Sequence, residues 1–425
     1  MHIGLFTYGS RGDVQPYIAL ALRLIDDGYS VTLAAPENFK GFVESYHVPF
    51  FPVVGNAEEI VHSPECEKII KSGNNLAFIK FVFNSLSNRR SELFDGILSF
   101  CKSVDAIVAN NIGATTISVA VEKLNLKMII LQLNPPVIET SAFPVPGMPV
   151  PNLVWLNKLS YQLFYKLMWY YAKKDINEFR NRIGLPLSRN SVFKNISDAN
   201  VPVIHAFSKE LIERPLDWQP HHLVTGFLTL DHKKRSGNNF DQVSHYLNEW
   251  LTAGNRPVYI GFGSIPVPDP LKLKQIIMHL LTTTQERILL CTGWSKIPDL
   301  PKHPNLCIVS AVNHQWLFPK CKMVVIHGGI GTLTAALTAG VPSVVVSIFV
   351  DQPIWGQMVS NKGVGIHLPW RKLTKKSLTN AIKRINSTSQ ITDNAVLMGK
   401  KISAEDGVGA AAHYIKNYFK EVSYR

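Results

Sequence analysis

The stretch VVIHGGIGTLTAALTAGVPSVVVSIFVDQPIWG, residues 324–356, combines two strand patterns, a glycine-rich turn and a helix pattern. Its opening apolar run predicts a buried strand, which brings His327 to the carboxyl end of that strand. The glycines that follow allow a tight turn and a close approach of a ligand to the backbone. A helix is predicted from Thr332 to Ala339, and the run SVVVSIF predicts the next strand. Strand, helix and strand in this order indicate a parallel α/β sheet.

The same stretch predicts a binding site. The N-terminus of its helix presents free N–H groups and a positive dipole end, which suit a phosphate. Asp351 and Gln352 follow the second strand and are suited to hydrogen-bond hydroxyl groups. A diphosphate site beside a polyol site indicates a nucleotide-sugar pocket. The competing interpretation is that His327 is a structural histidine at a strand end.

Length and composition indicate a folded protein of two or three domains. The chain has 425 residues, of which 46% are hydrophobic and 18% charged. The net charge of +13 leaves two interpretations open: a solubilising surface, or attraction to an anionic membrane or cosubstrate. No signature of a nucleic-acid-binding module is present, so nucleic acid is not an expected partner.

The sequence predicts a cytoplasmic protein, with possible peripheral contact at the inner face of a membrane. The chain opens on a strand pattern without a leader, and no apolar run is long enough to span a membrane. Scattered cysteines without pairing are expected to be reduced and mostly buried, and no metal-ligand cluster is apparent. These cysteines are Cys66, Cys101, Cys291, Cys307 and Cys321.

Alternating strand and helix patterns predict two doubly wound, Rossmann-like domains with parallel sheets, facing each other across an interdomain cleft. The expected domains are 1–229 and 243–406, joined by a polar linker at 230–242, with a C-terminal helix at about 407–425 packing back on the first domain. In the first helix, Pro16 is expected in the first turn. The strands expected in the first domain are 2–8, 30–36, 48–53, 105–110, 127–133, 201–208 and 221–227.

Two segments of the first domain stand out. Residues 135–157 are rich in proline, which predicts a long ordered loop or lid. The helix expected at 159–183 carries many aromatic side chains, which either line an acceptor site or simply pack in the core.

The turn GSRGDVQP, residues 9–16, places Asp13 just before a predicted helix at the end of the first strand. One interpretation is that Asp13 complements the helix N-terminus. The other is that it acts as a base at the mouth of the cleft. A helix N-terminus lowers a carboxylate pKa, and burial under an apolar acceptor raises it again.

Three further strand ends in the second half are candidate contacts to a nucleotide. Ser264 lies in the turn GFGSI, and Trp294 follows the next strand as a possible cover for a base. Val312 and His314 follow the strand after that, and the alternative is that His314 and Trp316 pack against the following helix.

These segments together resemble the family 1 glycosyltransferases of GT-B fold. The closest subgroup is the sterol 3-β-glucosyltransferases and the related bacterial antibiotic glycosyltransferases. The motifs that carry the resemblance are HGGIGT, VDQPIWG, NHQWLFP, GFGSI, GSRGDVQPYIAL, AEDGVGAAAHYI and FSKELIERPLDWQPHHLVTGF.

The resemblance implies an inverting transfer of a hexose, usually glucose, from a UDP-sugar, with no metal and no other cofactor. Asp13 matches the general base of the family, and Asp351 and Gln352 match the pair that holds the sugar hydroxyls. The remaining donor-binding positions are Ser10, Arg11, Gly12, Ser264, Trp294, Val312, His314, His327, Gly329, Ile330, Gly331 and Thr332.

The acceptor is expected to be an apolar molecule with a hydroxyl, such as a sterol, another lipid or a polycyclic natural product. Its predicted contacts are Phe143, Tyr161 and Trp169. Plant members of the family keep a tryptophan at the approximate position of Ala311 in this chain. The residue that stacks on uracil is therefore unassigned, and Trp294 is a candidate for it. Two rival functions are an epimerase-like enzyme that needs no acceptor, and a non-catalytic UDP-sugar-binding or membrane-associated module.

Overall fold

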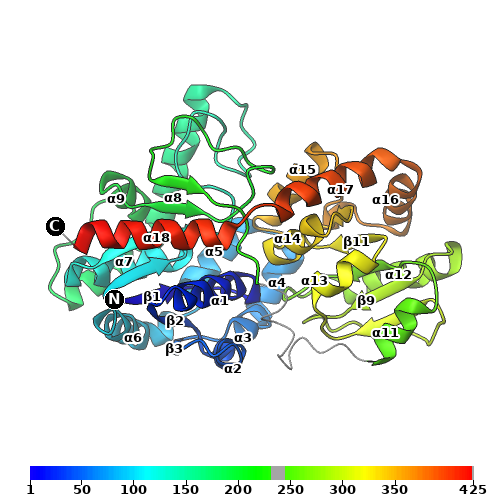
Figure 1. Cartoon of the computed structure of the whole chain (residues 1–425), viewed down its shortest axis with the longest axis horizontal. Helices are drawn as coiled ribbons and strands as arrows, with labels where there is room; N and C mark the ends of the chain where they lie inside the picture. Colours follow the sequence, from blue (N-terminus) through cyan, green and yellow to red (C-terminus); the bar gives the residue numbers. More distant parts are fainter. Residues whose placement is uncertain (231–244, 424–425) are drawn as a thin grey trace. The chain divides into compact units, whose positions relative to one another are not determined.

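The computed structural model describes residues 1–230 and 245–423, which form two compact units (Figure 1). Unit 1 comprises Met1–Ile60, Ile79–Asp231 and Glu405–Arg425. Unit 2 comprises His232–Ala404 together with Val61–Phe78, a segment from the first half of the chain. Of the predicted linker, Leu230 is buried in unit 1, and residues 231–242 lie outside the described part of the chain.

Unit 1 contains a seven-stranded, fully parallel sheet in the order β3-β2-β1-β4-β5-β6-β7. The order reverses at β1, which pairs with β2 on one side and β4 on the other, as Ile3 lies opposite both Val31 and Ala106. A doubly wound sheet binds ligands at such a switch point. The strands are β1 (His2–Phe6), β2 (Ser30–Pro36), β3 (Phe50–Val53), β4 (Ala106–Ala109), β5 (Lys127–Gln132), β6 (Val203–His205) and β7 (His222–Val224).

Helices separate these strands. The helices are α1 (Arg11–Asp26), α2 (Lys40–Glu44), α3 (Ala57–Val61), α4 (Pro64–Ser72), α5 (Asn75–Asn84), α6 (Arg90–Lys102), α7 (Asn111–Leu124), α8 (Val154–Arg182), α9 (Val192–Asp198) and α18 (Gly407–Ser423), with 3₁₀ turns η1 (Glu37–Phe39) and η2 (Ser87–Arg89). All of α4 and the start of α5, through Phe78, belong to unit 2.

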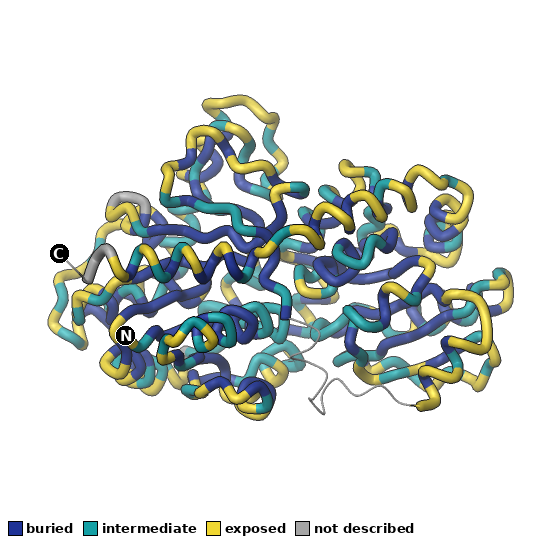
Figure 2. Tube along the Cα trace, viewed as in Figure 1, coloured by how far each residue is buried: buried dark blue, intermediate teal, exposed yellow. Residues whose placement is uncertain are grey.

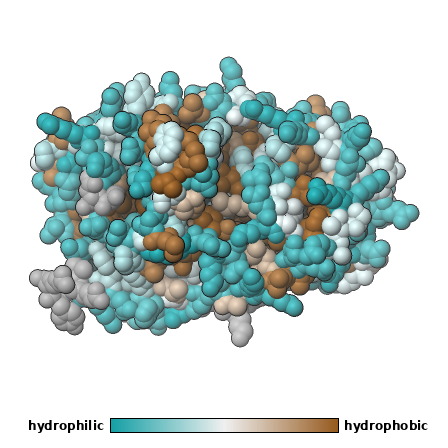
Figure 3. All heavy atoms as spheres, turned by 90° about the horizontal axis from the view of Figure 1, so that it is seen from above, coloured by the Kyte–Doolittle hydropathy of each residue, from teal (hydrophilic) through white to brown (hydrophobic). Residues whose placement is uncertain are grey.

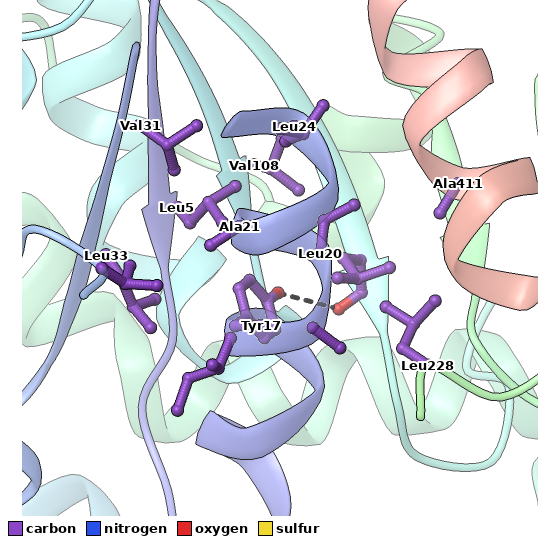
Figure 4. Packing of buried hydrophobic residues seen from close by; sticks show 14 of the residues in the cluster. Leu5, Tyr17, Leu20, Ala21, Leu24, Val31, Leu33, Val108, Leu228 and Ala411 are labelled. Carbon is purple, nitrogen blue, oxygen red and sulfur yellow. Dashed lines mark hydrogen bonds between the residues drawn. The ribbon is translucent and has the colours of Figure 1, made fainter. Parts of the chain in front are cut away.

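The core of unit 1 lies between the sheet and α1, and α18 completes it. Apolar residues of α1 at helical spacing, such as Tyr17, Leu20 and Leu24, face Leu5 and Val108 of the sheet (Figure 4). The Tyr17 hydroxyl donates to the Leu131 carbonyl at 3.2 Å, which satisfies its polar atom inside the core. Helix α18 adds further apolar residues to the same cluster, namely Ala411, Ala412, Ile415 and Phe419.

Unit 2 contains a six-stranded parallel sheet in the order β10-β9-β8-β11-β12-β13. Its strands are buried along most of their length, as expected for a parallel sheet covered on both faces (Figure 2). The strands are β8 (Val258–Gly261), β9 (Ile288–Cys291), β10 (Leu306–Val309), β11 (Met323–Ile326), β12 (Ser343–Val345) and β13 (Gly365–His367). The helices are α11 (His245–Thr252), α12 (Pro270–Thr283), α13 (His314–Leu317), α14 (Ile330–Thr338), α15 (Gln352–Asn361), α16 (Lys375–Ser387) and α17 (Ser389–Ser403), with η4 (Phe318–Lys320) and η5 (Trp370–Lys372).

The predicted fold class of two parallel-sheet, Rossmann-like domains is confirmed, while several helix boundaries differ. Helix α1 begins at Arg11, so Pro16 lies inside the helix, and the expectation that it stands in the first turn is wrong. Asp13 consequently lies in the first turn and not before the helix. Helix α8 begins at Val154, within the predicted proline-rich loop.

The described cysteines are all free and buried, as predicted. Among the described residues, no helix is long and apolar enough to cross a bilayer.

Candidate functional site

The turn after β11 folds closely around His327. Gly328 has φ of +89°, a left-handed conformation that glycine adopts readily. A Cβ atom at Gly328 would lie 2.6 Å from Val345 Cγ1, so the backbone has no room for a side chain here. The structure therefore explains the first glycine of the motif by local packing, and the strand delivers His327 to the sheet's carboxyl edge as predicted.

The His327 side chain is 5% exposed, and its Nδ1 atom has no hydrogen-bond partner among the described residues. Burial lowers the pKa of His327 to about 4, so the imidazole is neutral at pH 7. A neutral ring carries one N–H donor and one acceptor nitrogen. A buried polar atom without a partner in a glycine-rich turn is a candidate ligand contact.

Helix α14 follows this turn and leaves its first backbone N–H groups available. Gly329 is the N-cap residue, and the N–H of Leu333 makes the first bond of the helix, to the Gly329 carbonyl, at 3.0 Å. The amides of Ile330, Gly331 and Thr332 precede that bond, so they have no partner within the helix. Three N–H groups at the positive end of a helix dipole form an anion-binding arrangement.

Gln352 lies against this turn, because a Cβ atom at Gly328 would be 3.6 Å from Gln352 Cβ. The Gln352 Oε1 atom accepts from the Ile348 N–H at 2.8 Å. Its amide NH₂ group is the part of the side chain that a ligand can use. The carbonyl oxygen instead fixes the loop that leads into α15.

Asp351 is the N-cap residue of α15, and its Oδ2 atom accepts a hydrogen bond from Trp355 Nε1 at 3.0 Å. This bond orients the carboxylate. Burial raises the pKa of Asp351 above its usual range, while the Trp355 bond opposes that shift. An oriented carboxylate with reduced solvation is a strong acceptor for hydroxyl donors.

The turns after β8 and β9 meet beside His327. A Cβ atom at Gly263 would lie 3.0 Å from His327 Cε1. The backbone N–H of Trp294 donates to the Gly263 carbonyl at 3.1 Å. Ser264 and Trp294 are partly exposed. Unit 2 thus gathers its predicted donor-binding turns at one edge of its sheet.

The histidine after β10 has structural partners. The His314 Nε2 atom is 2.9 Å from the Tyr259 hydroxyl, and its ring stacks on Phe318 at a centroid distance of 4.7 Å. Val312, just before it, is partly exposed. His314 therefore packs against residues of β8 and η4.

In unit 1, Asp13 is the third residue of α1, and its carboxylate is held by the residue that caps the helix. The N–H and the hydroxyl of Ser10 both donate to Asp13 Oδ2, at 2.8 and 3.1 Å. The capping interpretation of Asp13 is confirmed, and the side chain remains partly exposed.

The neighbours of Asp13 have different surroundings. The Arg11 guanidinium lies over the Phe42 ring, 4.5 Å from its centroid, while Gly12 is partly exposed in the same turn.

Asn110 is a residue to which the sequence analysis assigned no role. Its Nδ2 donates to the Tyr8 carbonyl at 2.8 Å, which ties the end of β4 to the turn that carries Asp13.

The predicted loop is ordered by side-chain hydrogen bonds to α8. Asn157 Nδ2 donates to the Ser141 carbonyl at 2.7 Å, and the Val145 N–H donates to Ser160 Oγ at 2.8 Å. Phe143 lies between these two anchor points and is partly exposed.

The predicted acceptor contacts on α8 differ in exposure. Tyr161 is 0% exposed, and its hydroxyl has no partner among the described residues, so it offers no surface to a ligand as folded. Trp169 lines a small apolar cavity with Met168, Ala172 and Phe193. The cavity volume of ≈ 10 Å³ is about that of one water-sized sphere, far too small for a polycyclic molecule.

The chain matches known families in both halves. Residues 3–141 match the glycosyltransferase family 28 N-terminal domain, and residues 275–407 match the C-terminal domain of erythromycin biosynthesis protein CIII-like proteins.

Curated relatives match nearly the whole chain. Sterol 3-beta-glucosyltransferase UGT80A2 of Arabidopsis thaliana is 33% identical over 99% of this chain and 66% of its own length. UGT80B1 of the same plant is 32% identical over 97% of this chain and 67% of its own length. The sterol 3-beta-glucosyltransferase of Komagataella phaffii is 31% identical over 99% of this chain. The chain spans 66% and 34% of the lengths of UGT80A2 and the Komagataella enzyme.

Solved structures share the fold at low sequence identity. The glycosyltransferase of kitacinnamycin has a TM-score of 0.71 at 15% identity, with 98% of each chain covered. SnogD from Streptomyces nogalater has a TM-score of 0.67 at 17% identity, covering 98% of this chain and 99% of SnogD. SsfS6 of Streptomyces sp. SF2575, solved with thymidine diphosphate, has a TM-score of 0.61 at 17% identity, covering 98% of this chain and 99% of SsfS6.

Proposed function

Because the chain belongs to the family 1 glycosyltransferases of GT-B fold, which include the sterol 3-beta-glucosyltransferases, we propose that it transfers glucose from UDP-glucose to a hydroxyl of an apolar acceptor such as a sterol. The observation that carries this proposal is in unit 2. The free N–H groups of α14 and the buried His327 adjoin the loop with Asp351 and Gln352. That arrangement fits a diphosphate followed by a hexose.

The proposed reaction is a displacement with inversion at the anomeric carbon. Asp13 accepts the proton of the acceptor hydroxyl, and the oxygen forms a bond to the anomeric carbon. The bond from that carbon to the diphosphate oxygen breaks, and UDP leaves with the electron pair. The leaving group gains negative charge, which the α14 N–H groups and the His327 N–H stabilise. The glucose hydroxyls donate to Asp351, and Gln352 holds them through its amide NH₂.

We propose that this charge stabilisation proceeds without a metal ion. The donor set that faces the diphosphate consists of N–H groups, which bind an anion directly and are not metal ligands. Activity in excess EDTA should equal that in its absence. A loss that added Mg²⁺ or Mn²⁺ restores would contradict this part of the proposal.

The identity of the acceptor rests on the relatives named above, of which several are sterol 3-beta-glucosyltransferases. The test is a mass-spectrometric screen of the purified protein with UDP-glucose against sterols, other hydroxylated lipids and polycyclic natural products. A product heavier than the acceptor by one hexose is expected with a sterol. Transfer to none of these compounds would contradict the proposal.

Two further assays separate the rival functions: chromatography of the UDP-sugar, because an epimer has the same mass as the donor, and calorimetry of UDP-glucose binding with and without acceptor. An epimerase-like enzyme would convert the UDP-sugar in the absence of any acceptor. A binding module would bind UDP-glucose without turnover, and its affinity would not depend on an acceptor.

We also propose peripheral contact with an anionic membrane through the exposed face of α8. Trp155, Leu159 and Leu163 recur at every fourth residue of this helix, and Trp155 is 65% exposed. Lys158 and Lys166 are exposed on the same stretch. Figure 3 shows one face of the molecule, where hydrophobic residues gather between hydrophilic ones. Exposed tryptophan and leucine beside lysine are typical of surfaces that bind lipid headgroups.

Sedimentation with vesicles containing phosphatidylserine tests the membrane contact. Wild type should bind, and binding should weaken with salt because the lysine contribution is screened. Replacing both Trp155 and Leu159 with Ser should reduce binding at moderate salt. Exposed Tyr246 and Leu271 of unit 2 provide matched control positions. Equal binding by all variants would exclude α8 as the membrane-binding surface.

A further inference from the structure

Unit 2 includes the segment Val61–Phe78, which comes from the first half of the chain. The segment contains α4 and the first turn of α5, which Gly73 and Asn74 join. It contacts the rest of unit 2 at the loop just before Asp351, a residue that the proposed function assigns to sugar binding.

One contact fixes the end of α4. Arg371 Nη2 donates to the Ser72 carbonyl at 2.9 Å and to the Gly73 carbonyl at 3.3 Å. The last carbonyls of a helix lack partners within the helix, so a guanidinium suits this position. Gly73 itself has φ of +60° and ends α4 in the left-handed conformation.

A second set of contacts reaches the sugar-binding loop. The Val350 N–H donates to the Asn75 Oδ1 atom at 3.0 Å. The ring of Phe78 meets Phe349 edge to face, with centroids 4.7 Å apart and planes at 76°. Asn75 and Phe78 lie one turn apart on α5, so they contact two consecutive loop residues.

The loop needs such support because Val350 has φ of +58°. This left-handed conformation is unfavourable for a β-branched residue. The next residue is Asp351, so a relaxation of Val350 to negative φ would turn the Asp351 carboxylate away from its bond to Trp355. Strain of this kind persists only where surrounding contacts stabilise it.

We propose that Asn75 is a positioning residue for sugar recognition: by accepting the Val350 N–H, it holds the loop in the conformation that presents Asp351 to the donor sugar. This inference rests on the proposed function, since it assigns the role through Asp351. Asn75 touches neither the diphosphate turn nor the helix α14 in the contacts described above. Its removal therefore affects the hexose and leaves the UDP part of the donor unaffected.

Asn75→Ala tests the proposal when the dissociation constants of UDP-glucose and UDP are measured side by side by calorimetry. The UDP-glucose constant should rise about three- to tenfold, as expected for one lost hydrogen bond, while the UDP constant stays the same. Asn74→Ala is the matched control. Asn74 Oδ1 accepts the Ala77 N–H at 3.0 Å and so stabilises the same helix without contacting the loop.

A second substitution separates positioning from simple loss of structure. Glycine adopts a left-handed φ without steric cost, so Val350→Gly removes the strain that Asn75 supports. In the Asn75→Ala background, Val350→Gly should bring the UDP-glucose constant back toward that of wild type. A merely structural defect in α5 would not respond in this way.

The outcomes distinguish failure of the inference from failure of the proposed function. Wild type that binds neither UDP nor UDP-glucose would overturn both. Wild type that binds both, with Asn75→Ala weakening them equally or not at all, would overturn the positioning role alone. An equal effect of Asn74→Ala, or no recovery with Val350→Gly, would also overturn it.

Discussion

Ser10 holds the carboxylate of Asp13 at the start of α1 through two hydrogen bonds. The backbone N–H and the hydroxyl of Ser10 both donate to the Asp13 Oδ2 atom, at 2.8 and 3.1 Å. The pair fixes the carboxylate at the carboxyl end of β1, where the strand order of unit 1 reverses. A fixed carboxylate at a switch point is suited to accept a proton from a bound hydroxyl.

Asp13→Asn should lower kcat by about 100- to 10,000-fold, because it removes the proton acceptor while keeping an oxygen for Ser10. The KM for UDP-glucose should change little, since Asn keeps the bonds that hold the turn with Ser10, Arg11 and Gly12, and the other proposed donor contacts lie in unit 2. Release of UDP, followed in steady state, measures both constants. Asp26→Asn, at the other end of α1, is the control, and full activity of Asp13→Asn would remove Asp13 as the base.

His327→Ala should weaken UDP-glucose binding about tenfold or more, because a buried N–H donor to the diphosphate is lost. The free protein holds His327 neutral, with a pKa of about 4. A bound anion favours the protonated ring, so the pKa rises on binding and UDP-glucose affinity should increase as the pH falls from 7 toward 5. Calorimetry at several pH values checks this. The increase should be absent from His327→Ala, and its persistence there would assign it to another group.

Acid should destabilise unit 1 through its buried histidines. Burial lowers the pKa of His205 well below 6.5 and that of His222 to about 4. The unfolded chain takes up these protons as the pH falls through 6.5 and the folded chain does not. Both histidines therefore lower the stability of the folded chain as the pH falls below 6.5, by up to about 1.4 kcal/mol per histidine per pH unit, and the loss due to His222 ends near pH 4.

His205→Phe isolates one of these residues. The His205 ring stacks on Trp218 at 4.1 Å, and neither of its nitrogens has a partner among the described residues, so phenylalanine keeps the contact and removes the proton site. The variant should lose less thermal stability than wild type between pH 7.5 and pH 5. An identical loss in both proteins would show that His205 does not titrate on unfolding.

Gly226→Ala should lower the free energy of unfolding by about 1–3 kcal/mol through steric overlap, in addition to the cost of placing alanine at a positive φ. Gly226 has φ of +97°, and a Cβ atom would lie 3.0 Å from Glu405 Oε2. Gly28→Ala is a matched control, since Gly28 has φ of +86° with nothing within 4 Å of the added atom. The control should cost only about 1 kcal/mol from strain. Denaturant unfolding measures both, and equal losses would contradict the packing argument.

The sheet strands and the glycine-rich turns after them were predictable because they follow from short-range patterns. Apolar runs such as 323–326 with glycine after them indicate a strand and a turn from adjacent residues alone. The same reasoning missed β13 and the helices between 57 and 84, where strand and helix patterns are short. It also placed the start of α1 too late, because Pro16 favours a first turn but is accepted inside this helix.

Contacts between residues far apart in the chain were not predictable. Nothing near Asn75 indicates that its side chain accepts the Val350 N–H, because the two residues are separated by 275 positions. His314 illustrates the same limit, since the Tyr259 hydroxyl beside it comes from β8, 55 positions earlier in the chain. Sequence patterns therefore predicted the positions of the turns. Which side chains in those turns are already hydrogen-bonded depends on strands and helices that come from elsewhere in the chain.

The return of α18 to unit 1 has a consequence for biosynthesis. Ala411, Ala412, Ile415 and Phe419 complete the core that β1 and α1 begin. β1 leaves the ribosome before α18, so its core stays open until α18 has been made. All of the second sheet is synthesised in between, and it can fold while the first unit waits with apolar surface exposed. Newly made chains stopped before α18 are therefore expected to depend on chaperones, although the sheet of unit 2 is complete.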